Sequence, residues 1–171
     1  MTSIENQVAR RHVRPFNSPL ECGLRALFIL NASQNTSMDL QRIVAYDYLL
    51  LNSGDIENGP KSLHPAVPHR GAELLVKRDA IRAGLEQMLA KELIRINFTS
   101  QGFLYSATEL TGAFINLLKS PYATELKNRA NWIDNRFRIF SDQAIDSYIS
   151  HNVGRWGAEF ETLAAIDLVE L

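Results

Sequence analysis

The residues best able to carry out chemistry in this sequence are its histidines and its single cysteine. The histidines are His12, His64, His69 and His151, and the cysteine is Cys22. No two histidines have the i, i+4 spacing with which one helix presents two ligands to zinc, and no second cysteine is present. An internal disulfide and a multi-cysteine zinc site are therefore excluded. Because Cys22 lies in an apolar run, we expect it to be part of the core.

One segment could still bring reactive groups together. His64 and His69 share a proline-rich stretch with Asp55, but a metal or acid–base site would require Asp55 to fold back beside them. Ordinary loop packing accounts for the same residues. The sequence has no G-x-S-x-G nucleophile motif and no glycine-rich pattern of the kinds that bind nucleotide phosphates. We therefore expect no catalytic residues, no metal and no cofactor, and a protein that is not an enzyme.

Length and composition restrict the possible partners. With 171 residues, of which 46% are hydrophobic, the chain can bury one substantial core. Its formal net charge of -1 lacks the basic excess usual in nucleic-acid-binding domains, so any DNA contact would have to be a local patch. No window approaches the ~20 apolar residues that span a bilayer, and the first residues do not resemble a signal peptide. The sequence thus indicates a cytoplasmic protein without membrane contact.

Capping signals and apolar spacing predict two helices in the first third of the chain. Ser18-Pro19-Leu20-Glu21 forms a capping box with proline at the first helical position, and the helix that follows is apolar on nearly every side. Thr36 and Asp39 indicate the start of a second helix over 38–52. Two helices joined by a short polar turn are typical of a helix-turn-helix core. Segment 53–71 contains three of the six prolines and is expected to be a loop.

The next elements have the order of a winged helix. A helix is expected over 73–93, and the apolar alternation in 94–98, followed by a turn and a second extended run, predicts a β-hairpin. A helix should follow the capping box Ser106-Ala107-Thr108-Glu109. Further helices should begin at Ser120-Pro121 and Ser141-Asp142, and a last one should carry Trp156, Phe160 and Leu163.

These elements predict a mainly α (α+β) fold. Its centre would be a winged helix-turn-helix core with one β-hairpin wing, followed by a C-terminal helical extension. Residues 1–17 would form a flexible N-terminal arm, residues 18–119 the winged-helix domain with its Pro/Gly-rich loop 53–71, and residues 120–171 the helical extension.

Four basic residues occupy positions from which winged helices commonly contact a duplex. They are Lys77, Arg78, Arg82 and Arg95. The acids Asp79, Glu86 and Glu92 interleave with them and weaken the local positive potential, which would make phosphate binding modest and salt-sensitive. The same residues could equally form a solvated or protein-facing surface.

Two other segments are candidates for partner contacts. The proline-rich loop offers Asp55, His64, His69 and Arg70 on a chain whose prolines limit the entropy lost on docking. The C-terminal stretch carries Trp156 and Phe160 among acidic residues. Such an amphipathic segment could lie in a partner's groove or cover its own core.

Three sequence runs resemble a known family. The runs are RPFNSPLECGLRALFIL, YDYLLLNSGDIENGPKSLHPAVPHRGAELLVKRDAI and GFLYSATEL, and the resemblance extends over about residues 14–140. They are similar to the middle-component subunits of bacterial three-component ABC ATPase systems, a group that includes Lamassu-type anti-phage defence.

This resemblance implies a non-catalytic adaptor. The adaptor would bind an SMC-like ABC ATPase subunit and an effector subunit such as a nuclease, and would help couple DNA sensing to effector activation. Double-stranded DNA could be reached through the complex. The alternative from the residues themselves is a stand-alone winged-helix transcription regulator that grips DNA through the four basic residues.

Overall fold

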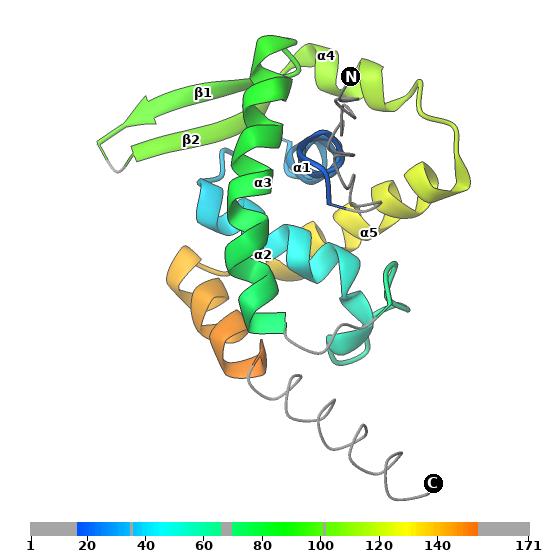
Figure 1. Cartoon of the computed structure of the whole chain (residues 1–171), viewed down its shortest axis with the longest axis vertical. Coiled ribbons are helices and arrows are strands. Elements are labelled where there is room, and N and C mark those ends of the chain that lie inside the picture. The colour runs from blue at the N-terminus through cyan, green and yellow to red at the C-terminus, as the bar shows by residue number, and fades with distance from the viewer. Residues whose placement is uncertain (1–16, 35, 66–69, 101, 154–171) are drawn as a thin grey trace, which may run out of the picture.

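The computed structural model describes residues 17–34, 36–65, 70–100 and 102–153 of the chain. In order, the elements are α1 (Pro19–Ala32), α2 (Leu40–Leu51), the short 3-10 helix η1 (Ser53–Asp55), α3 (Arg70–Ala90), β1 (Ile94–Thr99), β2 (Gly102–Ala107), α4 (Glu109–Ile115) and α5 (Pro121–Phe137). Residues 142–153 are also helical. The described part of the chain is mainly helical with one antiparallel hairpin, which projects from the helical body (Figure 1). None of the helices described here is long and apolar enough to cross a membrane.

Helix α1 is the centre of the core. As the sequence predicted, it begins at Pro19, and the side chain of Ser18 accepts a hydrogen bond of 3.2 Å from the N–H of Glu21. Its residues from Leu27 to Leu30 are buried around the whole helix, because α2, α3, α4 and α5 all pack against it. Cys22 is fully buried, which confirms its predicted place in the core.

Two glycines let α1 and α3 touch. A Cβ atom built at Gly84 would lie 2.3 Å from the carbonyl oxygen of Pro19 and 2.5 Å from the nitrogen of Gly23. One built at Gly23 would lie 2.7 Å from the carbonyl oxygen of Gly84. The two backbones are therefore in direct contact, and neither position has room for a larger residue.

The end of α3 directs the chain into the hairpin. Glu92 has a positive φ of 58°, and the N–H of Leu93 donates to the carbonyl of Met88 at 3.0 Å. This left-handed reversal ends the helix in the manner of a Schellman motif. The hydroxyl of Thr111 in α4 donates to the carbonyl of Leu93 at 2.5 Å and fixes the start of β1.

The hairpin that the apolar alternation predicted is present, as the antiparallel pair β1–β2. Ile96 pairs with Tyr105 and Phe98 with Phe103. Met38, in the connection between α1 and α2, adds an antiparallel bridge on the other side of β2. Its N–H donates to the carbonyl of Tyr105 at 2.9 Å, and the N–H of Tyr105 donates back at 2.7 Å.

The C-terminal helices share the same core. The hydroxyl of Ser33, just after α1, donates to Asp134 of α5 at 2.5 Å. Arg42 of α2 donates to the carbonyls of Phe137 at 3.1 Å and Phe140 at 2.9 Å, and pairs with Asp142 at 2.7 Å. Buried residues before and after the predicted boundary at residue 120 therefore belong to one continuous hydrophobic core.

Two helices begin differently from the sequence prediction. Helix α3 begins at Arg70, three residues before the expected position and inside the predicted loop 53–71. The capping box of α4 is formed by Thr108 and Thr111, not by Ser106 and Glu109. Ser106 is the register partner of Arg95, so it belongs to the strand and cannot cap the helix. Of the predicted arm 1–17, only Asn17 lies within the described residues.

The contact at Gly84 predicts that alanine at this position destabilises the protein, whereas alanine at Gly112 does not. We expect Gly84→Ala to lower the free energy of unfolding by about 1–3 kcal/mol, because the new methyl group overlaps backbone atoms of α1. Urea titration measures this change. Gly112→Ala in α4 is the control: its Cβ would meet only the side-chain oxygen of Asn31 at 3.3 Å, and alanine favours a helix by up to about 1 kcal/mol. A Gly84→Ala protein as stable as the wild type would contradict the close contact.

Candidate interaction surfaces

The hairpin carries the most exposed aromatic pair of the described residues. Phe98 is 78% exposed and Phe103 is 60% exposed, and their rings meet edge to face with centroids 5.3 Å apart. Both lie near the end of the hairpin furthest from the helices (Figure 1). Large aromatic side chains held in water in this way are typical of surfaces that a partner covers.

A buried ion pair joins α1 to α2. Arg25 donates to both carboxylate oxygens of Asp47 in α2, from Nε at 2.5 Å and from Nη2 at 3.0 Å. Both side chains are almost completely buried. Burial alone would lower the pKa of the Arg25 guanidinium, but the adjacent Asp47 carboxylate raises it, so this arginine stays charged. The pair holds α1 and α2 in one orientation.

The proline-rich loop is attached to the body through its histidine. A ring nitrogen of His64 lies 2.8 Å from the hydroxyl of Tyr122 in α5, and the two rings stack. The N–H groups of Leu63 and His64 donate to the carbonyl of Leu51, at 3.0 and 3.3 Å. Burial lowers the pKa of His64, and the charge of Arg25 acts in the same direction. His64 thus supports the loop as a neutral ring.

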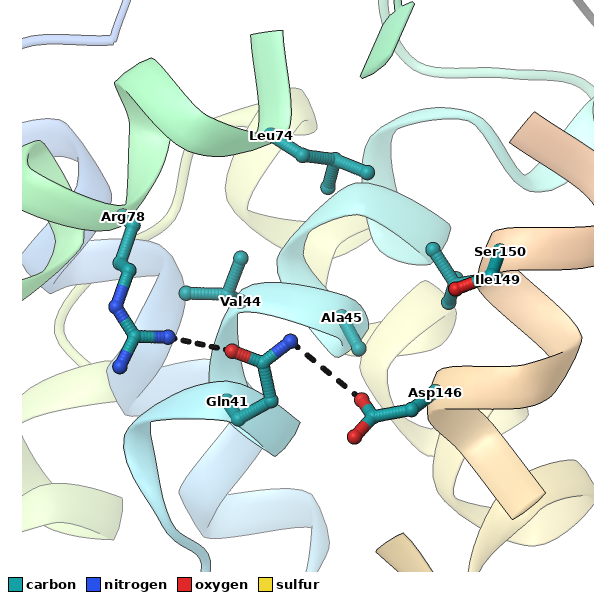
Figure 2. A pocket seen from close by; sticks show the side chains of 8 residues that line it. All are labelled: Gln41, Val44, Ala45, Leu74, Arg78, Asp146, Ile149 and Ser150. Atoms are coloured by element: carbon teal, nitrogen blue, oxygen red, sulfur yellow. Dashed lines mark hydrogen bonds between the residues drawn. The ribbon is translucent and has the colours of Figure 1, made fainter. Parts of the chain in front are cut away.

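A groove of about 410 Å³ lies between α2, α3 and the helix over 142–153. Figure 2 shows its polar side: Gln41 accepts a hydrogen bond from Arg78 and donates to Asp146 at 3.5 Å. The rest of the groove is lined mostly by apolar side chains, from Val44, Ala45, Leu74 and Ile149. Gln41 therefore links a cation on one wall to an anion on the other.

The four predicted DNA contacts do not form one surface. Lys77 is only 4% exposed, so it is not available to a phosphate. It lies four residues before Ile81 and seven before Gly84, and therefore shares the buried face of α3 instead of lying off the apolar stripe. Arg78 is engaged with Gln41, and Arg82 pairs with Asp79 at 3.0 Å.

Arg95 belongs to a different face. Strand alternation places it opposite Ile94, Ile96 and Phe98, and its Nε donates to Ser106 at 3.3 Å. It lines a second, mostly polar groove of about 500 Å³ between the hairpin, the end of α1 and the start of α4. Arg95 therefore lies on the opposite face of the hairpin from Ile96, and the two faces cannot contact one duplex together with α3.

The predicted partner contacts are described only in part. Asp55 lies in η1 and is half-buried, and His64 is bonded to Tyr122. Arg70 is the first residue of α3, but its side chain falls outside the described part of the structure. His69, Trp156 and Phe160 also lie outside the described residues. Within the described ranges, no three His, Cys, Asp or Glu residues form a cluster able to hold a metal ion.

Sequence reasoning overlooked the exposed pair Phe98 and Phe103. A signal was present, because the two residues flank the turn at positions that a two-residue hairpin loop places opposite each other. The alternation predicts a hairpin but does not say which of its apolar side chains are exposed. Phe98 and Phe103 are exposed because the hairpin extends beyond the helices, and this extension is visible only in the structure.

The His64 contact predicts a pH-dependent stability. The folded-state pKa of His64 is below its unfolded value of about 6.5, so the unfolded chain binds more protons between those two values. We expect the free energy of unfolding to fall as the pH is lowered from about 7.5 to about 5.5, and His64→Gln to reduce this dependence. Urea titrations across the range measure it, with His151→Gln as the control. Equal pH dependence in the wild type and His64→Gln would contradict the assignment.

One of the three comparisons with known proteins identifies a family. No curated protein matches this chain, and no solved structure does. The family model of the ABC-three component (ABC-3C) system Middle Component 2 matches residues 15–159, a span that contains every described element from α1 to the helix over 142–153. The chain therefore belongs to the Middle Component 2 family of ABC-three component systems.

Proposed function

We propose that this chain is a non-catalytic adaptor in an anti-phage ABC-three component system of the Lamassu type. In this role it binds the SMC-like ATPase subunit and helps to couple DNA sensing to activation of an effector, such as a nuclease. Family membership supports its place among several subunits. The observation that carries the proposal is the exposed Phe98–Phe103 pair on a projecting hairpin.

We also propose a winged-helix topology for the core. A bridging residue between the first two helices, a third helix and then a hairpin is the order of elements in that fold. The long connection over 52–69 takes the place of the tight turn of a helix-turn-helix. The hairpin would then be the wing.

The chemistry of this wing favours protein over DNA. From Ile96 to Leu104 the sequence contains no charged residue, whereas phosphate contacts depend mainly on Lys and Arg. The basic candidates are buried, paired or on another face, which weakens the alternative of a stand-alone regulator. An uncharged aromatic tip is suited to an apolar site on another protein subunit.

Co-expression with the ATPase and effector subunits of its ABC-three component system tests the proposal. We expect the three proteins to co-purify, and Phe98→Ser with Phe103→Ser to weaken the complex by about tenfold or more, since exposed aromatic anchors often dominate binding. Affinity is measured by titration of the purified subunits.

The control is Ile139→Ser, which removes an apolar side chain that is 84% exposed and lies outside the hairpin, in the connection after α5. This variant should bind like the wild type. If the chain elutes alone at its own mass from the co-expression, the adaptor proposal is wrong.

A further inference from the structure

The edge of β1 that faces away from β2 is an open strand edge. The hydrogen bonds between Tyr105 and Met38 show which backbone groups of β1 point toward it. Tyr105 uses both its N–H and its C=O on Met38, so neither group faces β1. In an antiparallel pair, the opposite residue then also directs both groups away. Ile96 is that residue, and its backbone N–H and C=O therefore point outward from the hairpin.

The same orientation repeats every second residue. Ile94 and Phe98 direct their backbone groups to the outer edge, while Arg95, Asn97 and Thr99 bond across to β2. Among the described residues, the backbone groups of Ile96 and Phe98 have no hydrogen-bond partner at this edge. Ile94 lies where the strand leaves the helical body, so Ile96 and Phe98 form the accessible part.

Natural edge strands are usually protected from pairing. A charged side chain, most often lysine, a proline or a bulge on the edge is the common device. The strand Ile94–Thr99 has no lysine or proline, and its register with β2 is continuous, without a bulge. Its one charged side chain is Arg95, and residues 96–99 carry no charge. Nothing in the sequence or register of Ile96–Thr99 therefore blocks pairing with another strand at this edge.

The two faces of β1 define the chemistry of that strand. One face presents Ile96 and Phe98, with Phe103 beside them, and calls for apolar side chains. The other presents Arg95 and Asn97. Arg95 bonds to the hydroxyl of Ser106 and forms no ion pair with any carboxylate of the described residues. An incoming strand would match this edge with alternate apolar residues and an acidic residue beside Arg95.

We propose that β1 binds an extended segment of another subunit of the ABC-three component system by strand addition. The segment alternates apolar and polar residues, carries an acidic side chain near Arg95, and extends the hairpin to three strands. This inference rests on the proposed adaptor function and deepens it, because it names the backbone contact through which the hairpin docks. Backbone hydrogen bonds supply affinity, and Phe98 with Phe103 supplies an apolar anchor.

Removal of one outward N–H tests the backbone contact. Ile96→Pro deletes an N–H that the hairpin itself does not use, and an edge strand tolerates proline at such a position. Ile96→Val keeps the N–H and most of the side chain and is the matched control. We expect Ile96→Pro to weaken binding in the three-component complex by about tenfold or more, and Ile96→Val to bind like the wild type. Equal affinity of both variants would overturn strand addition.

Amide hydrogen exchange of the wild-type chain tests the same contact without substitution. In the free chain, the amides of Ile96 and Phe98 should exchange rapidly and that of Asn97 slowly. In the complex, the Ile96 and Phe98 amides should slow by about tenfold or more while Asn97 changes little. If the complex forms but these two amides keep their free rates, the inference is wrong and the adaptor proposal stands.

The remaining outcomes separate the two proposals. If the purified chain alone forms a dimer in which the Ile96 and Phe98 amides are already protected, a second copy occupies the edge and the inference is overturned. If the other subunits do not bind the chain at all, the adaptor proposal itself has failed.

Discussion

The contact between α1 and α3 at Gly23 and Gly84 is the constraint that sets the rest of this architecture. Because the two backbones touch, α1 lies deep enough for the other helices to surround it, and its side chains become buried around the whole helix. The same contact fixes the position of α3 along its axis. The left-handed turn at Glu92 then sets the direction in which the hairpin leaves the body.

Polar side chains hold the remaining helices around this pair. Arg25 and Asp47 orient α2 on α1, Arg42 binds the end of α5, and Ser33 binds its side. A buried ion pair costs desolvation energy that roughly offsets its attraction, so its main effect is on geometry. The orientation of α2 that places the Asp47 carboxylate within reach of both Arg25 nitrogens also places Gln41, Val44 and Ala45 in the groove.

Local signals were the part of this fold that could be predicted from sequence. Ser18, Ser120 and Ser141 each bond to the backbone within three residues, so their helix starts follow from neighbouring residues alone. The hairpin followed from the alternation of Ile94, Ile96 and Phe98 for the same reason.

Features that depend on distant partners could not be predicted in this way. Lys77 is buried because of what packs over its face of α3, and the anchor of His64 is Tyr122, which is 58 residues away. The exposure of Phe98 depends on how far the strand extends beyond the helices. Each of these needs the position of a second element, which no window of sequence contains.

The bridge between Met38 and Tyr105 gives the hairpin two points of attachment. Its first strand continues from the end of α3, and its second strand is bonded to the connection between α1 and α2. A force on the tip of the hairpin therefore acts on α3, through β1, and on the connection after α1, through Met38. These are the two helices that meet at Gly23 and Gly84. The hairpin is thus held at two points, so that a force on its tip is transmitted to the centre of the core.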